Sequence, residues 1–152
     1  MAVKPIPEGY HTVTPYLTVA DAEAQIDFLK KAFGAEETYR HTDEKGRVGH
    51  AEVRVGNSMV MIGQARDQWT PRPAQFYLYV EDVDAVYKRA VAAGGKSMQE
   101  PTDQAYGDRS GGVEDSQGNY WWVGTHIEDV SPEEIQRRYQ KQAATAGGEK
   151  SK

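Results

Sequence analysis

Two stretches of the chain repeat one pattern of strand, turn and strand. The first covers residues 51–63 and turns at the Gly-Asn pair 56–57, and the second covers residues 113–124 and turns at the Gly-Asn pair 118–119, an offset of 62 in the numbering. Asn and Gly are typical residues of hairpin turns. Self-similarity at a fixed spacing indicates a duplicated module, here present as two copies of about sixty residues.

The repeat extends upstream of the hairpins. Tyr16 to Val19 resembles Tyr77 to Val80, and Gly34 resembles Gly95, in both cases at an offset of 61. A capping Asp and apolar residues at helical spacing follow each of these strands. We therefore expect each copy to contain a strand, a helix and three further strands. The first strand of the first copy is expected from Thr12 to Val19, and a short strand near Lys96 to Gln99 in the second copy is expected to be followed by a loop from Glu100 to Gly107.

These signals predict an α+β fold, with two tandem βαβββ modules that form a curved mixed sheet enclosing a cavity, followed by a C-terminal helix. The sequence Ser131-Pro132-Glu133-Glu134 starts that helix as a capping box. We expect it to end near Ala143 and the remaining tail to be disordered. The predicted segments are a lead-in at 1–11, the first module at 12–63, a linker at 64–74, the second module at 75–128 and the C-terminal part at 129–152.

Composition excludes several classes of protein. The net charge is −5, and no basic stripe suggests nucleic-acid binding. The chain has no cysteine, which removes disulfides, thiol nucleophiles and thiolate metal sites. No apolar run is long enough to span a membrane and no signal peptide is evident, so we expect a cytoplasmic protein that contacts neither membrane nor nucleic acid.

Two stretches of the sequence resemble the vicinal oxygen chelate superfamily. They are Gly-His-Ala-Glu-Val-Arg-Val-Gly-Asn-Ser-Met-Val-Met, which starts at Gly49, and Tyr-Gly-Asp-Arg-Ser-Gly-Gly-Val-Glu-Asp-Ser-Gln-Gly-Asn-Tyr-Trp-Trp, which starts at Tyr106. That superfamily contains glyoxalases, bleomycin-resistance proteins and extradiol dioxygenases. The likeness covers about residues 10–128 and is strongest to the PhnB-like branch. It implies the paired-module fold given above.

The resemblance also implies where a divalent metal would bind. The superfamily's four ligand positions correspond here to Thr14, Val60, Gln75 and Trp122. Of these four residues only Gln75 has a plausible donor atom, whereas a first-row metal needs several imidazole or carboxylate donors together. We therefore expect no cofactor, although a divalent metal is possible at another place.

His50 and Glu52 are the best candidates for such a place, or for an acid–base pair. They are two residues apart on a predicted strand, so they share one face, and His41 on the neighbouring strand could join them. The alternative is an ordinary polar stripe on the sheet.

The remaining candidate site is a cavity for an organic ligand, lined by Thr14, Tyr16, Val60, Gln75, Tyr77 and Trp122. Aromatic faces bind planar or cationic molecules. The neighbouring Trp121 must point the opposite way from Trp122, into the protein. Trp69, in the linker, either caps the cavity or packs across a subunit boundary.

Arg109 could bind a carboxylate or phosphate of a ligand, or pair internally with Asp108, Glu114 or Asp115. Two function classes remain open. One is a homodimeric binding protein for a small planar or cationic molecule, as the likeness to bleomycin-resistance proteins implies. The other is an enzyme of the lyase or isomerase kind, either metal-independent or with a displaced metal, in which His50 and Glu52 are catalytic.

Overall fold

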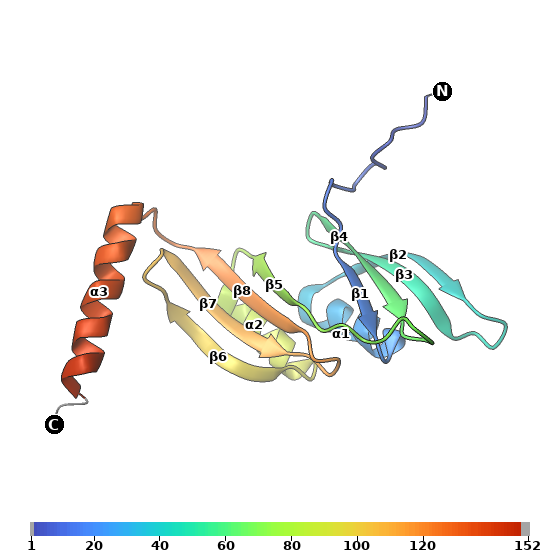
Figure 1. Ribbon diagram of the computed structural model, residues 1–152. Coiled ribbons are helices and arrows are strands. Elements are labelled where there is room, and N and C mark those ends of the chain that lie inside the picture. The colour runs from blue at the N-terminus through green and yellow to red at the C-terminus, as the bar shows by residue number, and fades with distance from the viewer. Residues whose placement is uncertain (1, 150–152) are drawn as a thin grey trace.

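The structure is a computed structural model that describes residues 2–149. The first module contains β1 (Tyr16–Val19), α1 (Ala22–Phe33), β2 (Glu36–Thr42), β3 (Val48–Val55) and β4 (Ser58–Gln64). The second module contains β5 (Gln75–Tyr79), α2 (Val83–Ala92), β6 (Lys96–Asp103), β7 (Asp108–Glu114) and β8 (Tyr120–His126). The helix α3 (Pro132–Glu149) follows (Figure 1).

Each module forms its own four-stranded mixed sheet, in the order β1-β4-β3-β2 and β5-β8-β7-β6. The first strand of each module runs parallel to the last strand, and the other pairs are antiparallel. The predicted α+β architecture of two tandem modules is confirmed. The sheet is divided into two halves that lie side by side, and across the described residues they do not close into a barrel (Figure 1).

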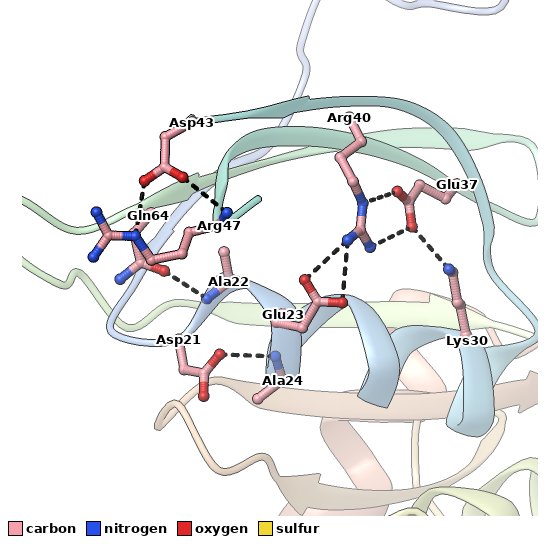
Figure 2. Close-up of polar contacts among 10 residues, drawn as sticks. All are labelled: Asp21, Ala22, Glu23, Ala24, Lys30, Glu37, Arg40, Asp43, Arg47 and Gln64. Carbon is pink, nitrogen blue, oxygen red and sulfur yellow. Dashed lines mark hydrogen bonds and ion pairs between the residues drawn. The ribbon is translucent and has the colours of Figure 1, made fainter. Parts of the chain in front are cut away.

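The helix α1 is fixed at both ends by its sequence. The side chain of Asp21 accepts a hydrogen bond from the Ala24 amide at 3.0 Å, and Gln64 accepts one from the Ala22 amide at 2.9 Å (Figure 2). Gly34 ends the helix with φ 65°, a conformation that glycine adopts without steric cost. The last strand of the module thus helps to satisfy the first turn of its helix.

A chain of charges joins α1 to β2. Arg40 pairs with both Glu37 and Glu23, and Lys30 lies 2.8 Å from Glu37 (Figure 2). The Arg40 hydrogen bond outweighs partial burial and lowers the pKa of Glu37 from 4.5 to about 2. The carboxylate therefore stabilises the attachment of α1 at neutral pH.

The helices of the two modules pack against each other, and the buried core is continuous between the modules. Trp121 of β8 is at its centre, with its ring stacked 4.5 Å from that of Phe76 and 5.4 Å from that of Phe33 in α1. Burial of large aromatic side chains is a dominant stabilising contribution in cores of this kind. The modules are therefore two halves of one packed unit.

A buried polar network crosses the same junction. Asp115, in the turn between β7 and β8, accepts hydrogen bonds from Gln25 of α1 at 2.9 Å and from the indole of Trp121 at 2.7 Å. Asn119 donates to Gln25 at 2.8 Å and accepts from the Ala74 amide at 2.9 Å. The Asp-x-x-Gly-Asn turn of the second module thus binds the helix of the first.

Two strands differ from the sequence prediction. The first strand was expected from Thr12, but β1 begins at Tyr16, since Pro15 has no amide hydrogen to donate to a neighbouring strand. The strand near residues 96–99 was expected to give way to a loop, but β6 continues to Asp103 through Pro101. Proline is tolerated there because β6 is an edge strand with register shifts on either side of Gln99.

The helix α3 extends away from the second sheet (Figure 1). Its capping box is confirmed in part, because the Ser131 hydroxyl accepts from the Glu134 amide at 3.2 Å. The helix passes its predicted end near Ala143 and continues to Glu149, through the alanine-rich stretch that was expected to be disordered. The predicted disorder of residues 150–152 lies outside the described residues. In the part of the chain that the structure covers, no helix is long and apolar enough to cross a membrane.

Candidate functional site

Each sheet has one face covered by its helix and one face turned away from it, which we call the first and second open faces. On the first open face, Tyr16 and Glu52 both pair with Met61. On the second open face, Tyr77 pairs with Trp122. These registers decide which predicted site residues come together.

Four polar side chains form a chain on the first open face. The Tyr16 hydroxyl lies 3.2 Å from His50 Nδ1, and His50 Nε2 lies 3.5 Å from Glu52. Tyr10, from the lead-in, donates its hydroxyl to Glu52. Burial, and then the hydrogen bond to Glu52, raise the pKa of Tyr10 to about 12. The chain joins a tyrosine hydroxyl, an imidazole and a carboxylate, which is an arrangement able to move a proton.

His41 does not complete a metal site with these residues. It lies directly opposite His50 in the β2–β3 register, and His50 and Glu52 do lie together. Over residues 2–149, however, no group of three or more His, Asp or Glu side chains could hold a metal ion. The hypothesis of a displaced three-residue cluster is therefore wrong.

Tyrosines on both open faces lie across glycines of the neighbouring strand. A Cβ added to Gly63 would come within 2.7 Å of the Tyr16 hydroxyl, and one added to Gly124 within 2.3 Å of the Tyr77 hydroxyl. The ring of Trp122 lies over Gly112 in the same way, at 2.4 Å from such a Cβ. Both faces therefore present aromatic rings packed against the backbone of glycines in the neighbouring strand.

A buried carboxylate supports the second open face. Asp108 accepts a hydrogen bond from the Tyr77 hydroxyl at 2.8 Å and lies 2.8 Å from His126 Nδ1, whose other ring nitrogen is 2.8 Å from Asp129. Burial acts to raise the pKa of Asp108, but its hydrogen bonds, first of all that from His126, hold the pKa below its ordinary value. Burial, and then the hydrogen bond with Tyr106, raise the pKa of Tyr77, so this tyrosine stays protonated. Sequence reasoning missed this cluster, for which the Gly-Asp-Arg phrase was the only signal.

The four positions that the superfamily uses for a metal do not form a donor set here. The Gln75 carbonyl oxygen accepts a hydrogen bond from Trp122 Nε1 at 3.1 Å. Thr14 precedes β1, and its hydroxyl donates to the His11 carbonyl. The residues therefore do not fit a divalent metal at this place.

Val60 requires a correction. It pairs with Val53 and is buried against α1, at the wall of a cavity between the modules, whereas Met61 occupies the position equivalent to Trp122. Trp122 pairs with Tyr77 and Met61 pairs with Tyr16, so the strands correspond at an offset of 61 rather than 62. A shift of one residue moves a side chain to the other face.

The adjacent tryptophans point in opposite directions, as expected. Trp121 is buried in the core, and Trp122 is half-buried on the second open face. Neighbouring residues of a strand point to opposite faces, and on the buried side Trp121 lines the cavity between the modules.

Arg109 is engaged with the protein itself, although not with the expected residues. Its guanidinium forms two hydrogen bonds to Asp84 of α2, at 2.9 and 3.0 Å, and one to Asp103 of β6 at 3.0 Å. Arg109 precedes the open-face position Ser110 and therefore points toward the helix side. Its donors are directed away from the second open face.

Three cavities border these faces. One, of about 590 Å³, lies between the modules along β5 and is lined mainly by apolar and aromatic residues, among them Phe33, Phe76, Tyr77, Tyr79 and Trp121. Another, of about 390 Å³, lies between the lead-in and the first open face, where Glu52 and Met61 line it. The third, of about 480 Å³, lies where the linker crosses the first open face, and we call it the linker pocket. It is lined by Tyr16, Thr18, Gly49, Gly63, Gln64, Arg66, Gln68, Trp69, Thr70 and Arg72.

Paired βαβββ modules with open faces of this kind define a glyoxalase-like protein. The chain belongs to the glyoxalase/bleomycin resistance protein/dioxygenase superfamily, whose sequence profile matches residues 10–123. It is 36% identical over 135 residues to an uncharacterised protein of Mycobacterium tuberculosis, Rv0887c, a match that covers 82% of this chain and 79% of the relative. An uncharacterised protein of Mycobacterium bovis, Mb0911c, is also 36% identical, with 89% of the relative covered.

Solved structures agree on the fold. TioX from Micromonospora sp. ML1 superposes with a TM-score of 0.68 at 26% identity, covering 77% of this chain and 99% of TioX. A glyoxalase-related enzyme from Fulvimarina pelagi gives 0.63 at 18% identity, with 76% and 87% covered. A PhnB protein from Bacillus cereus gives 0.61 at 19%, with 76% and 99% covered, in line with the resemblance to the PhnB-like branch.

Proposed function

We propose that the protein binds a small planar organic molecule, neutral or cationic, against the second open face, without a metal and without chemical conversion. The observation that carries this proposal is the hydrogen bond from Trp122 to Gln75. Trp122 itself occupies one of the superfamily's metal-ligand positions, and its indole N–H binds the side-chain oxygen of Gln75, which occupies another. An aromatic surface is therefore present where other members of the superfamily bind a metal.

The surroundings of Trp122 support a stacking site. Tyr77 and Tyr79 lie beside it on the same face, with ring centroids 5.1 Å apart and with Tyr79 68% exposed. Ring faces attract planar molecules by stacking and cations through their π electrons. The carboxylate of Asp108 beneath the tyrosines adds negative charge that favours a cationic ligand over an anionic one.

The binding test compares two tryptophans by calorimetric titration with a panel of planar cationic dyes that includes ethidium. Stacking contributes on the order of 1–3 kcal/mol per ring, so we expect Trp122→Ala to weaken binding about 5- to 150-fold. Trp69→Ala, a tryptophan outside the second open face, is the matched control and should leave the affinity unchanged. The proposal fails if no member of the panel binds saturably, or if the two variants weaken binding equally.

We propose further that the protein is a homodimer. Tyr16 is 56% exposed on the first open face and Tyr79 is exposed on the second, so a single chain leaves aromatic surface of both modules uncovered. A second copy that packs against this surface would remove part of it from water. Light scattering at micromolar concentration should give twice the chain's mass of 16.9 kDa. A monomer at that concentration would refute the assembly.

A second candidate function, a metal-independent lyase or isomerase, is favoured by the chain of Tyr16, His50, Glu52 and Tyr10 on the first open face. In this case His50 would take a proton from a bound substrate, and Glu52 would stabilise the imidazolium that forms. His50→Gln should then abolish turnover while leaving dye binding at Trp122 intact. Loss of dye binding in that variant would instead indicate a structural role for His50.

A further inference from the structure

The linker between the modules is held in a defined conformation. Arg66 and Trp69 exchange backbone hydrogen bonds of 2.9 and 2.8 Å around a tight turn in which Asp67 has φ 48°. The amides of Ala65 and Arg72 donate to carbonyls of β1 at 2.8 and 3.0 Å. The linker is thus attached on both sides of the turn to the strand that carries Tyr16.

Two arginines of the linker pocket have side chains that are not engaged with the protein. Most arginines of the described chain have a side-chain hydrogen bond or ion pair: Arg40, Arg47, Arg54, Arg89, Arg109, Arg137 and Arg138. Within residues 2–149, Arg66 and Arg72 are the arginines whose side chains have none. Both line the linker pocket, and among the described residues no acidic side chain lines it. Arg66 also lines a neighbouring cavity with Asp21, Glu23 and Asp43, but these carboxylates accept hydrogen bonds from other partners. Two guanidinium groups at one concave place, neither of them in an ion pair, favour an anion there.

A flat apolar surface borders the same place. Trp69 lines the linker pocket and is 62% exposed, which is costly for an indole that has no partner. Gln64, another lining residue, is already hydrogen-bonded to Ala22 and to the Ala20 carbonyl, so it forms part of the wall. The volume of about 480 Å³ is within the range of small-molecule sites.

We propose that the linker pocket binds a planar aromatic anion, with its ring against Trp69 and its carboxylate or phosphate held by Arg66 and Arg72. The site is independent of the proposed function, because none of these residues lies on the second open face. It also takes the opposite charge, since the second open face favours cations.

The test is calorimetric titration of the intact protein with 2-naphthoate, its neutral isostere 2-naphthamide, 1-naphthyl phosphate and inorganic phosphate. We expect saturable binding of one or both aromatic anions, and the tighter of the two identifies the anionic group. Arg66→Gln and Arg72→Gln should each weaken it about 5- to 50-fold, as loss of a charge-assisted hydrogen bond does. Trp69→Ala should weaken it to a similar extent. Arg54→Gln, at an exposed arginine that pairs with Glu36, is the matched control and should change nothing.

Three results would overturn the proposal. One is equal affinity for 2-naphthamide, which would exclude recognition of charge. Another is binding of inorganic phosphate as tight as that of the aromatic anions, which would exclude the ring. The third is a loss in Trp122→Ala as large as that in Trp69→Ala, which would place the anion on the second open face. Circular dichroism spectra of all variants establish that each is folded.

Discussion

Removing the carboxylate of Asp115 should destabilise the whole protein, because this side chain joins the two modules. Asp115 is 5% exposed and accepts hydrogen bonds from Gln25 and Trp121, both of which are 1% exposed. Asp115→Ala would leave three buried N–H donors without this partner, because the backbone amide of Asn119 also donates to Asp115 at 3.0 Å. Each unpaired donor costs about 1–3 kcal/mol. The expected loss is about 3–9 kcal/mol, against a total stability of roughly 5–15 kcal/mol for a domain.

Urea denaturation followed by far-ultraviolet circular dichroism would measure this loss as a lower transition midpoint at constant slope. Asp43→Ala is a matched control, since Asp43 accepts the backbone amides of Lys45 and Arg47 in a turn that is exposed to solvent. We expect that variant to lose much less stability, because its carboxylate is exposed to solvent. Equal losses in the two variants would refute the reasoning, because the expected difference comes from burial and not from the turn.

The pH dependence of stability supplies two further predictions. The pKa of Glu37 falls from 4.5 to about 2 on folding, so its stabilising contribution is present above pH 4.5 and disappears as the pH falls through 2. Glu37→Gln should lose about 1–3 kcal/mol at pH 7 and little at pH 2, whereas an equal loss at both values would contradict this. Hydrogen bonds to Asp129 and then Asp108 raise the pKa of His126 above 6.5, so its contribution is complete below pH 6.5 and is lost as the pH rises through the raised value. The difference in urea midpoint between wild type and His126→Gln should therefore shrink from pH 6 to pH 9, and a constant difference would argue against it.

The paired-module fold could be predicted because duplication leaves a signal that needs no structure. Strand, helix and turn signals recur at nearly constant spacing, and helix periodicity distinguishes α1 and α2 from the strands around them. The ends of elements were less predictable where a proline stood. Pro15 lies just before β1, but Pro101 lies inside β6, although both strands are at an edge of their sheets. The ladder of β6 is irregular between Gln99 and Thr102, and such an irregularity accommodates the missing donor of Pro101.

The residues of the candidate site could be predicted only where the pairing register of the strands could be predicted. The turn between β3 and β4 has two residues between its last paired residues, Val55 and Ser58, whereas the turn between β7 and β8 has five between Glu114 and Tyr120. An alignment on the Gly-Asn pairs therefore runs one residue out of step along β4. For this reason Val60 was predicted at the position that Met61 occupies. The difference in turn length cannot be recognised from the sequence of either hairpin alone.

The contacts between modules could not be predicted from local patterns. Gln25 and Asp115 are 90 positions apart, and their hydrogen bond depends on how α1 lies against the β7–β8 turn. The partners of Arg109 were missed for a similar reason, because Asp84 approaches it only when α2 packs on β7. The linker pocket was also missed. Residues 64–74 were predicted to be a linker because of their proline and polar residues, and this composition does not reveal which other residues their side chains approach.

The rings that lie over glycines have a consequence for how the open faces can change during evolution. A side chain added at Gly63 or Gly124 would displace the ring of Tyr16 or Tyr77 from the space above it. If the tyrosine is first replaced by a small residue, a larger residue at the glycine position fills the gap without that displacement. Substitutions at each tyrosine–glycine pair should therefore show epistasis, and a new binding shape would be reached most easily when the tyrosine changes first.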